Sequence, residues 1–178
     1  MPKTDRIHIQ KGDITELKVD AIVNAANKSL MGGGGVDGAI HRAAGPELKE
    51  YNKKHGGCKT GEAKLSPGFN LSAKYVISTV GPVWNGGNND EDQLLENCYQ
   101  NSLELAKENE IETIAFPSIS TGIYGFPFER ACKIALTTTK QFLKENELPQ
   151  EVTMVVFSDD DLEKYKQVRD ELIDKKEP

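Results

Sequence analysis

Short apolar runs and amphipathic stretches follow one another along the chain, which predicts strands that alternate with helices. Runs rich in Ile, Val and Phe predict strands at 6–10, 21–23, 74–80, 113–116 and 152–157. Apolar residues three or four positions apart predict helices at 36–45, 46–55, 90–109, 128–143 and 162–173. Because strands joined by helices tend to run parallel, the pattern indicates an α/β sandwich with a mostly parallel sheet.

The length of 178 residues fits a single domain over 1–178, large enough to bury a core. The charged end, 174–178, is expected to fray. No apolar run approaches the roughly 18 residues of a membrane helix, and the first residues lack the apolar stretch of a signal peptide. Cys58, Cys98 and Cys132 are far apart and form no CxxC pair, which favours a reducing cytoplasm over disulfides or structural zinc.

The net charge restricts the partners of the chain. A formal charge of −6 argues against nucleic acid, because nucleic-acid binding depends on clustered Lys and Arg. An anionic small molecule is compatible with this charge only if main-chain amides, rather than basic side chains, bind it.

The most informative segment is a run of four glycines, residues 32–35, that leads into a predicted helix. Without Cβ atoms this backbone can turn freely and approach a ligand closely. The start of a helix also offers unpaired N–H groups and the positive end of the helix dipole, which favour anionic oxygens. Asp37 stands at the mouth of this loop, either as a carboxylate that the dipole favours or as a reactive group. His41 lies one helical turn further on the same face, where a neighbouring side chain is a commoner partner than a substrate.

A second loop with similar features spans 117–127. It follows a predicted strand, contains two glycines and three hydroxyl side chains, and leads into a helix. It is either an ordinary strand-to-helix connection or a loop that binds phosphate through main-chain N–H groups. It contains neither a Walker A sequence nor a GxGxxG fingerprint. Two such loops in one small domain suggest a ligand with a diphosphate.

Polar or aromatic residues also follow the first, second and last predicted strands. Asp13 is either a turn residue that bonds its own backbone or an acceptor for an exocyclic amine. Asn24 and Asn27 either stabilise a bend or bind sugar hydroxyls. Phe157 is either a core residue or an aromatic platform for a base. Ligands of such sheets bind at the carboxyl ends of the strands, so these residues are candidates for one site.

Taken together, these motifs resemble those of the macrodomains, and in particular the MacroD-type ADP-ribosyl hydrolases. The resemblance extends in order over almost the whole chain. It rests on Gly-Asp-Ile-Thr at 12–15, Val-Asp-Ala-Ile-Val-Asn-Ala-Ala-Asn at 19–27, the glycine segment 32–44, Val-Gly-Pro-Val-Trp at 80–84, and 116–125. It implies a three-layer α/β/α sandwich around a mixed, mostly parallel sheet, with ADP-ribose bound at its crest.

The resemblance also implies a role for each candidate residue. Asp13 and the backbone of Ile14 would bind the adenine, with Phe157 stacked on it. The diphosphate would lie against the main chain of Ser120, Thr121, Gly122, Ile123, Tyr124 and Gly125, with Tyr124 covering the distal ribose. That ribose would be held by Asn24, Asn27, Asp37 and the backbone of Gly33, Gly34, Gly35 and Val36, and His41 would support Asp37 from behind.

The implied activity is hydrolysis of esters on the distal ribose, with Asn27 and Asp37 as catalytic residues and with no metal or cofactor. The substrates would be mono-ADP-ribosylated acidic side chains of proteins and O-acetyl-ADP-ribose. Asp37 could activate the water as a base, or could only position it while a substrate phosphate takes the proton. The rivals are a reader that binds ADP-ribose without turnover and a phosphatase for ADP-ribose 1″-phosphate. We expect a cytoplasmic monomer that binds neither nucleic acid nor membrane.

Overall fold

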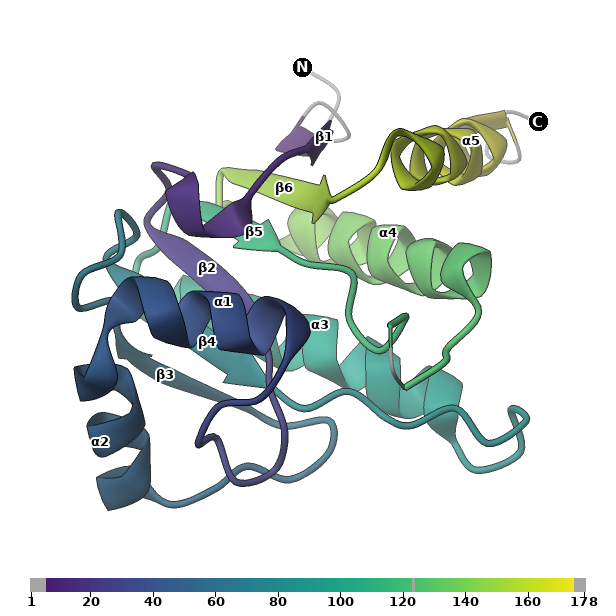
Figure 1. Cartoon of the computed structure of the whole chain (residues 1–178). Coiled ribbons are helices and arrows are strands. Elements are labelled where there is room, and N and C mark those ends of the chain that lie inside the picture. Colours follow the sequence, from purple (N-terminus) through teal and green to yellow (C-terminus); the bar gives the residue numbers. More distant parts are fainter. Residues whose placement is uncertain (1–5, 123, 175–178) are drawn as a thin grey trace.

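A six-stranded sheet forms the centre of the computed structural model, which describes residues 6–122 and 124–174 (Figure 1). Its strands lie in the order β1-β6-β5-β2-β4-β3. All neighbouring strands pair in parallel except β3, which runs antiparallel to β4 with Leu65 opposite Ile77. The prediction of a mixed, mostly parallel sheet is therefore confirmed. The strands are β1 (Ile7–Lys11), β2 (Ala21–Ala25), β3 (Ala63–Pro67), β4 (Tyr75–Thr79), β5 (Thr113–Phe116) and β6 (Glu151–Val156).

Local sequence explains where the first two α-helices, α1 and α2, begin and end. α1 starts after Gly34 and ends at Gly45, whose φ of +93° is accessible mainly to glycine. Pro46 then opens α2, because the first turn of a helix needs no N–H from it. The helices are the 3₁₀ turn η2 (Ile14–Glu16), α1 (Gly35–Ala44), α2 (Pro46–His55), α3 (Glu91–Glu108), α4 (Phe128–Glu145) and α5 (Asp159–Asp174).

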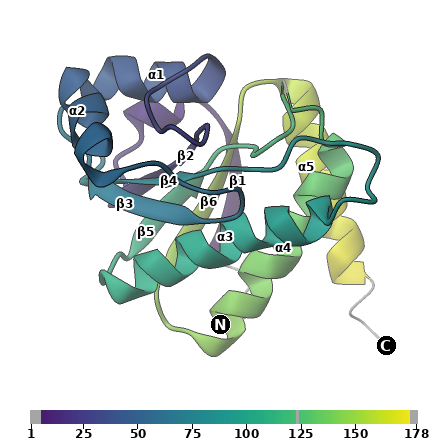
Figure 2. The same cartoon turned by 90° about the horizontal axis from the view of Figure 1, so that it is seen from below.

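Helices cover both faces of the sheet, which gives the expected three-layer α/β/α arrangement (Figure 2). α1 and α2 lie on one face, while α3 and α4 lie on the other and α5 packs beside β1 and α4. The larger core joins the sheet to α3, α4 and α5 and includes Phe116, Leu95 and Tyr99. A smaller core under α1 and α2 includes Ile22, Ile40 and Leu48.

The sequence analysis missed one strand, β3. It also placed the ends of several helices and strands one to three residues from where the structure has them. β3 is an edge strand with Lys64, Ser66 and a terminal Pro67, so its own residues carry a weak strand signal. Its pairing with β4 and its contact with α3 make it a strand. Residues 175–178 of the tail and the predicted ligand residue Ile123 lie outside the described residues.

Candidate functional site

A buried carboxylate in the first turn of α1 forms the centre of the candidate site. Asp37 is 5% exposed, and its Oδ1 accepts a hydrogen bond of 2.8 Å from Nδ2 of Asn24, at the end of β2. His41, one helical turn later, places Nε2 3.4 Å from the same oxygen without forming a hydrogen bond. The pair of Asn24 and Asp37 thus fixes the carboxylate relative to the sheet, and His41 stands behind it as the sequence predicts.

Asn27 shapes the loop that precedes this helix. Its Nδ2 donates to the carbonyl of Gly32 over 3.0 Å, and its Oδ1 accepts from Ser29 Oγ and from the Leu30 N–H. Gly33 lies between the two candidate catalytic side chains. A Cβ added there would be 3.2 Å from Oδ2 of Asp37 and 3.5 Å from Nδ2 of Asn27. The structure therefore brings Asn27 and Asp37 to the same glycine, although Asn27 is also a loop-stabilising residue.

The glycine loop presents unpaired N–H groups to solvent. The first hydrogen bond of α1 runs from the Gly38 N–H to the Gly34 carbonyl, so the N–H groups of Gly35 and Val36 precede the helical ladder. Gly33, Gly34 and Gly35 are all exposed. Positive φ values of +100° at Gly32 and +58° at Gly35 explain why this turn needs glycine at those two positions. The loop has the N–H geometry of an anion site, as expected.

The second loop leaves β5 and is closed by its own hydrogen bonds. The Phe126 N–H donates to the Ser120 carbonyl over 2.9 Å, and the Gly125 N–H donates to Gly122 over 3.0 Å. The Gly125 N–H is thus engaged within the loop, so fewer free N–H groups face a ligand than the sequence suggested. Among the described residues, the N–H groups of Thr121 and Gly122 have no hydrogen-bond acceptor.

Ser120 has an unusual conformation for a serine. Its φ is +66°, it is 8% exposed, and its Oγ has no hydrogen-bond partner in the described part of the chain. Gly81 lies against this side chain, and a Cβ at that position would collide with Ser120. Among the described residues, three of the five buried polar atoms without a partner belong to the candidate site: Asn24 Oδ1, His41 Nε2 and Ser120 Oγ. Such atoms are typical of sites that a ligand or water completes.

A further loop, residues 82–90, supports Tyr124, and the sequence analysis used only its first residues, 82–84, and only for the family resemblance. The Trp84 N–H donates to the Tyr124 carbonyl over 2.8 Å. The Trp84 ring lies 4.8 Å from Phe126 and 5.0 Å from the guanidinium of Arg130. Glu91 is buried, and its carboxylate accepts from the N–H groups of Asn85, Gly87 and Asn89 at 2.6–3.0 Å. Gly86 and Gly87, which both have positive φ, are the sequence feature that could have indicated a tight loop around this carboxylate.

The other end of the site lies at β1 and β6. Asp13 caps η2, since its Oδ1 accepts from the Thr15 N–H over 2.9 Å and from the Thr15 hydroxyl over 2.6 Å. Asp13 thus has the structural role of a turn residue, and its second oxygen takes no part in this cap. Ile14 is buried. Phe157 follows β6 and is 65% exposed, so the alternative of a core residue is wrong.

Sheet order arranges these residues in a line. Asp13 follows β1, Phe157 follows β6, the loop with Ser120 follows β5, and Asn24 and Asn27 belong to the end of β2. These four strands are direct neighbours in the order β1-β6-β5-β2. Because they are parallel, their carboxyl ends lie on one edge, and the predicted base, diphosphate and ribose positions follow one another along it.

Within 6–122 and 124–174, no group of three or more His, Cys, Asp or Glu side chains could hold a metal ion. No helix in those ranges is long and apolar enough to cross a membrane. An open groove between α3, α4 and α5 has side chains of both charge signs, including Glu96, Lys133 and Glu171.

Comparison with known proteins agrees with this geometry. The family model described as Macro domain matches residues 23–135. The chain is 57% identical to a macro domain-containing protein of Methanosarcina mazei, over 95% of this chain and 90% of that protein. It is 53% identical to the O-acetyl-ADP-ribose deacetylase of Escherichia fergusonii, over 90% and 93%. It is 54% identical to the ADP-ribose glycohydrolase MACROD2 of Xenopus laevis, over 96% of this chain and 41% of that longer protein.

Solved structures show the same fold. A mutant of the Oceanobacillus iheyensis macrodomain with ADPR superposes with a TM-score of 0.89 at 46% identity, over 93% of this chain and 92% of that one. The Trypanosoma brucei macrodomain in complex with ADP-ribose gives a TM-score of 0.86 at 42% identity, over 91% and 68%. A family match over more than half of the chain and relatives above 50% identity lead to one conclusion: the chain belongs to the macrodomain family.

Proposed function

We propose that this chain is a hydrolase that removes single ADP-ribose units from acidic side chains of proteins and deacetylates O-acetyl-ADP-ribose. The observation that carries the proposal is the buried carboxylate of Asp37, which Asn24 orients and which shares the surroundings of Gly33 with Asn27. A protein that only binds ADP-ribose needs the base and diphosphate loops but no such pair at the ribose end. The similarity to an O-acetyl-ADP-ribose deacetylase and to an ADP-ribose glycohydrolase supports the same assignment.

In the proposed complex, ADP-ribose lies along the edge formed by β1, β6, β5 and β2. Asp13 and Ile14 bind the adenine, and the exposed ring of Phe157 stacks on it. The free N–H groups of Thr121 and Gly122, together with those of Gly33, Gly34, Gly35 and Val36, face the diphosphate and distal ribose in this proposal. Main-chain N–H groups suit this ligand because they bind phosphate without adding positive side chains to a chain of net charge −6.

The reaction needs a positioned water and a restrained ribose. In the proposal, the Asp37 carboxylate orients a water whose oxygen bonds to the ester carbonyl carbon. The bond from that carbon to the ribose oxygen then breaks, and the ribose oxygen leaves as a hydroxyl after taking a proton. The proton from the water passes either to Asp37 or to a phosphate oxygen of the substrate. Asn27 and Tyr124 restrain the ribose, and His41 restrains Asp37.

Loss of label from a protein mono-ADP-ribosylated on glutamate tests this function. We expect release by the wild type, in the presence of EDTA as well, and loss of most turnover in Asp37→Ala and Asn27→Ala. Binding of ADP-ribose without release of any ester would identify a reader, and release of inorganic phosphate from ADP-ribose 1″-phosphate would favour the phosphatase. We also propose a monomer that acts in a reducing cytoplasm on modified proteins and does not bind nucleic acid. Light scattering and salt-dependent binding measurements test these points.

A further inference from the structure

Positive charge is concentrated on two segments beside the ribose end of the candidate site. Residues 26–36 and 51–61 contain no Asp or Glu, although the chain as a whole carries a net charge of −6. Lys28, Lys53, Lys54 and Lys59 lie on these segments and are exposed, and the half-buried Lys64 follows them on β3. We call these five lysines the basic margin.

Main-chain and side-chain contacts hold the two segments together. The Cys58 N–H donates to the Lys28 carbonyl over 2.8 Å, and Nδ2 of Asn52 donates to the Leu30 carbonyl over 2.9 Å. Gly57 packs so closely on Lys28 that a Cβ there would collide with its carbonyl. The C-terminal end of α2 and the chain after it are therefore fixed against the loop that starts at Asn27.

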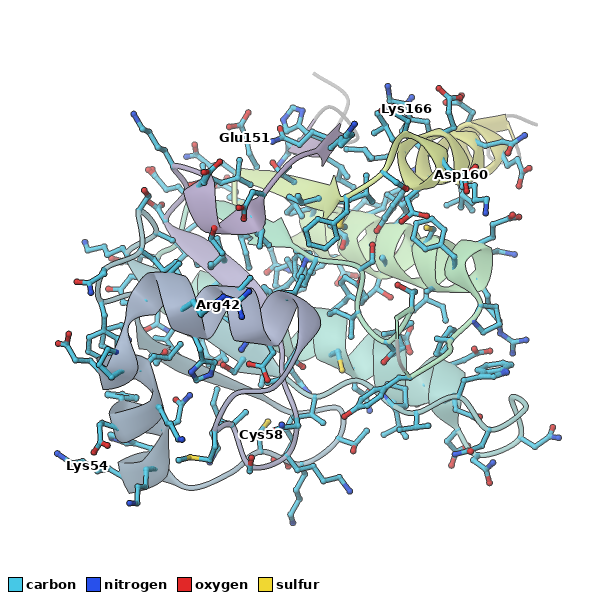
Figure 3. All side chains as sticks on the ribbon, viewed as in Figure 1. Arg42, Lys54, Cys58, Glu151, Asp160 and Lys166 are labelled. Carbon is cyan, nitrogen blue, oxygen red and sulfur yellow. The ribbon has the colours of Figure 1, made fainter. Side chains whose placement is uncertain are left out.

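The basic margin borders the site on the side where the substrate continues into its protein. The chain after α2 runs along the lower edge of Figure 1, beneath the loop that leads into α1. Figure 3 shows Cys58 under this loop and Lys54 extending from the free end of α2, far from Lys166 on α5. Lys28 is the residue directly after Asn27. A modified side chain leaving the distal ribose thus emerges next to these lysines.

Most of these lysines are not neutralised by the protein itself. Among the described residues, Lys28, Lys53, Lys54 and Lys59 form no ion pair, as is true of several lysines elsewhere, while Lys11 and Lys164 pair with aspartates. Lys64 donates to the His55 carbonyl over 3.1 Å. Glu50 and Glu62 are the carboxylates that border the second segment, one on each side. Unpaired charge of one sign at the rim of a site attracts a partner of the opposite sign.

We propose that the basic margin binds an acidic segment of the modified protein, and so directs the enzyme to ADP-ribosylated glutamates and aspartates that lie among other carboxylates. This inference rests on the function proposed above. It gives a chain of net charge −6 a group of lysines where the substrate protein must approach. It also predicts that small esters of ADP-ribose, which carry no peptide, do not use these lysines.

Three substrates separate this inference from the proposed function. They are O-acetyl-ADP-ribose, a peptide ADP-ribosylated on one glutamate flanked by Asp and Glu, and the same peptide flanked by Asn and Gln. The test variant combines Lys28→Gln, Lys53→Gln and Lys59→Gln. Its matched control combines Lys107→Gln, Lys133→Gln and Lys166→Gln on α3, α4 and α5, so both lose the same charge.

We expect the wild type and the control to prefer the acidic peptide, and this preference to fall as salt increases. Each exposed charge pair contributes little by itself, but the margin variant loses three lysines together. It should therefore lower kcat/KM for the acidic peptide about threefold or more. Its kcat/KM for O-acetyl-ADP-ribose and for the neutral peptide should equal that of the wild type. A margin variant that keeps the full preference for the acidic peptide overturns the inference.

Two further outcomes remain informative. If the wild type hydrolyses no substrate, the proposed function fails, and the inference is then tested by peptide affinity measured by fluorescence anisotropy. The inference is supported if the margin variant binds the acidic peptide, but not the neutral one, more weakly than the wild type does. It is overturned if the margin variant and the wild type bind the acidic peptide equally well. If single-stranded RNA displaces the acidic peptide and binds more tightly, the surface is a nucleic-acid site and the inference is wrong.

Discussion

Nδ2 of Asn24 donates a 2.8 Å hydrogen bond to Oδ1 of Asp37, and this contact joins the end of β2 to the first turn of α1. Both side chains are buried, at 1% and 5% exposure. The bond therefore fixes the carboxylate in an environment where an unpaired charge is costly. It also leaves Oδ2 on the side of Gly33, where the site opens.

Asn24→Ala should destabilise the fold and slow the reaction. The substitution leaves the buried Asp37 carboxylate without its donor, and hydrogen bonds to charged groups contribute about 1.5–3 kcal/mol. Thermal unfolding measures the loss. In the double variant with Asp37→Ala, most of this penalty should disappear, because the carboxylate that lacked a donor is gone. Additive penalties would contradict a direct interaction between the two residues.

Asp13→Asn should weaken ADP-ribose binding without unfolding η2. The amide oxygen can still accept from Thr15, so the cap remains, but the second carboxylate oxygen is replaced by a donor. Asp13→Ala loses both functions, and its affinity should fall by roughly 10- to 150-fold in calorimetry. Wild-type affinity in Asp13→Asn would mean that Asp13 only caps the turn.

Gly81→Ala should disturb the second loop through a direct collision with Ser120. Overpacking of this kind typically costs about 1–3 kcal/mol, so the melting temperature and the affinity for ADP-ribose should both fall. Gly122→Ala is the matched control for stability, since no atom lies within 4 Å of its added Cβ. A Gly81→Ala protein with wild-type melting temperature would show that the loop adjusts without cost.

Glu91 should make stability depend on pH in the acid range. Burial alone would raise the pKa of Glu91, but hydrogen bonds from the N–H groups of Asn85, Asn89 and Gly87 outweigh it and lower this pKa to about 2. The folded-state pKa is thus below the unfolded value, so the stabilisation is complete above about pH 4.5 and is lost as the pH falls towards 2.

Unfolding by urea at several pH values checks this prediction. In Glu91→Gln, stability should change less between pH 4.5 and pH 2 than in the wild type. Glu91→Gln should also weaken ADP-ribose binding at neutral pH, because the same loop carries the Trp84 N–H that holds Tyr124. Identical acid dependence in the two proteins would show that Glu91 is not the group responsible.

Much of the fold could be predicted because its signals are local. The runs around Ile22 and Ile114 are apolar because these strands are buried on both faces, and the glycines and Pro46 mark helix ends by their backbone requirements. β3 escaped prediction because an edge strand with Lys64 and Pro67 is defined by its partner rather than by its own residues. The sequence likewise could not show whether Phe157 is buried or exposed, because a residue at the end of a strand can be either.

The sequence by itself determined the alternation of strands and helices, the two glycine-containing loops, and the residue types available for binding an anionic nucleotide. It did so because backbone preferences and hydrophobic periodicity act over only a few neighbouring residues. Only the tertiary structure decided that Asn24 orients Asp37, that Gly81 confines Ser120 and that Glu91 supports the loop beneath Tyr124. The contacts of Asn24 with Asp37, of Gly81 with Ser120 and of Trp84 with Tyr124 join separate segments of the chain, so they exist only once parallel strands bring their carboxyl ends to one edge.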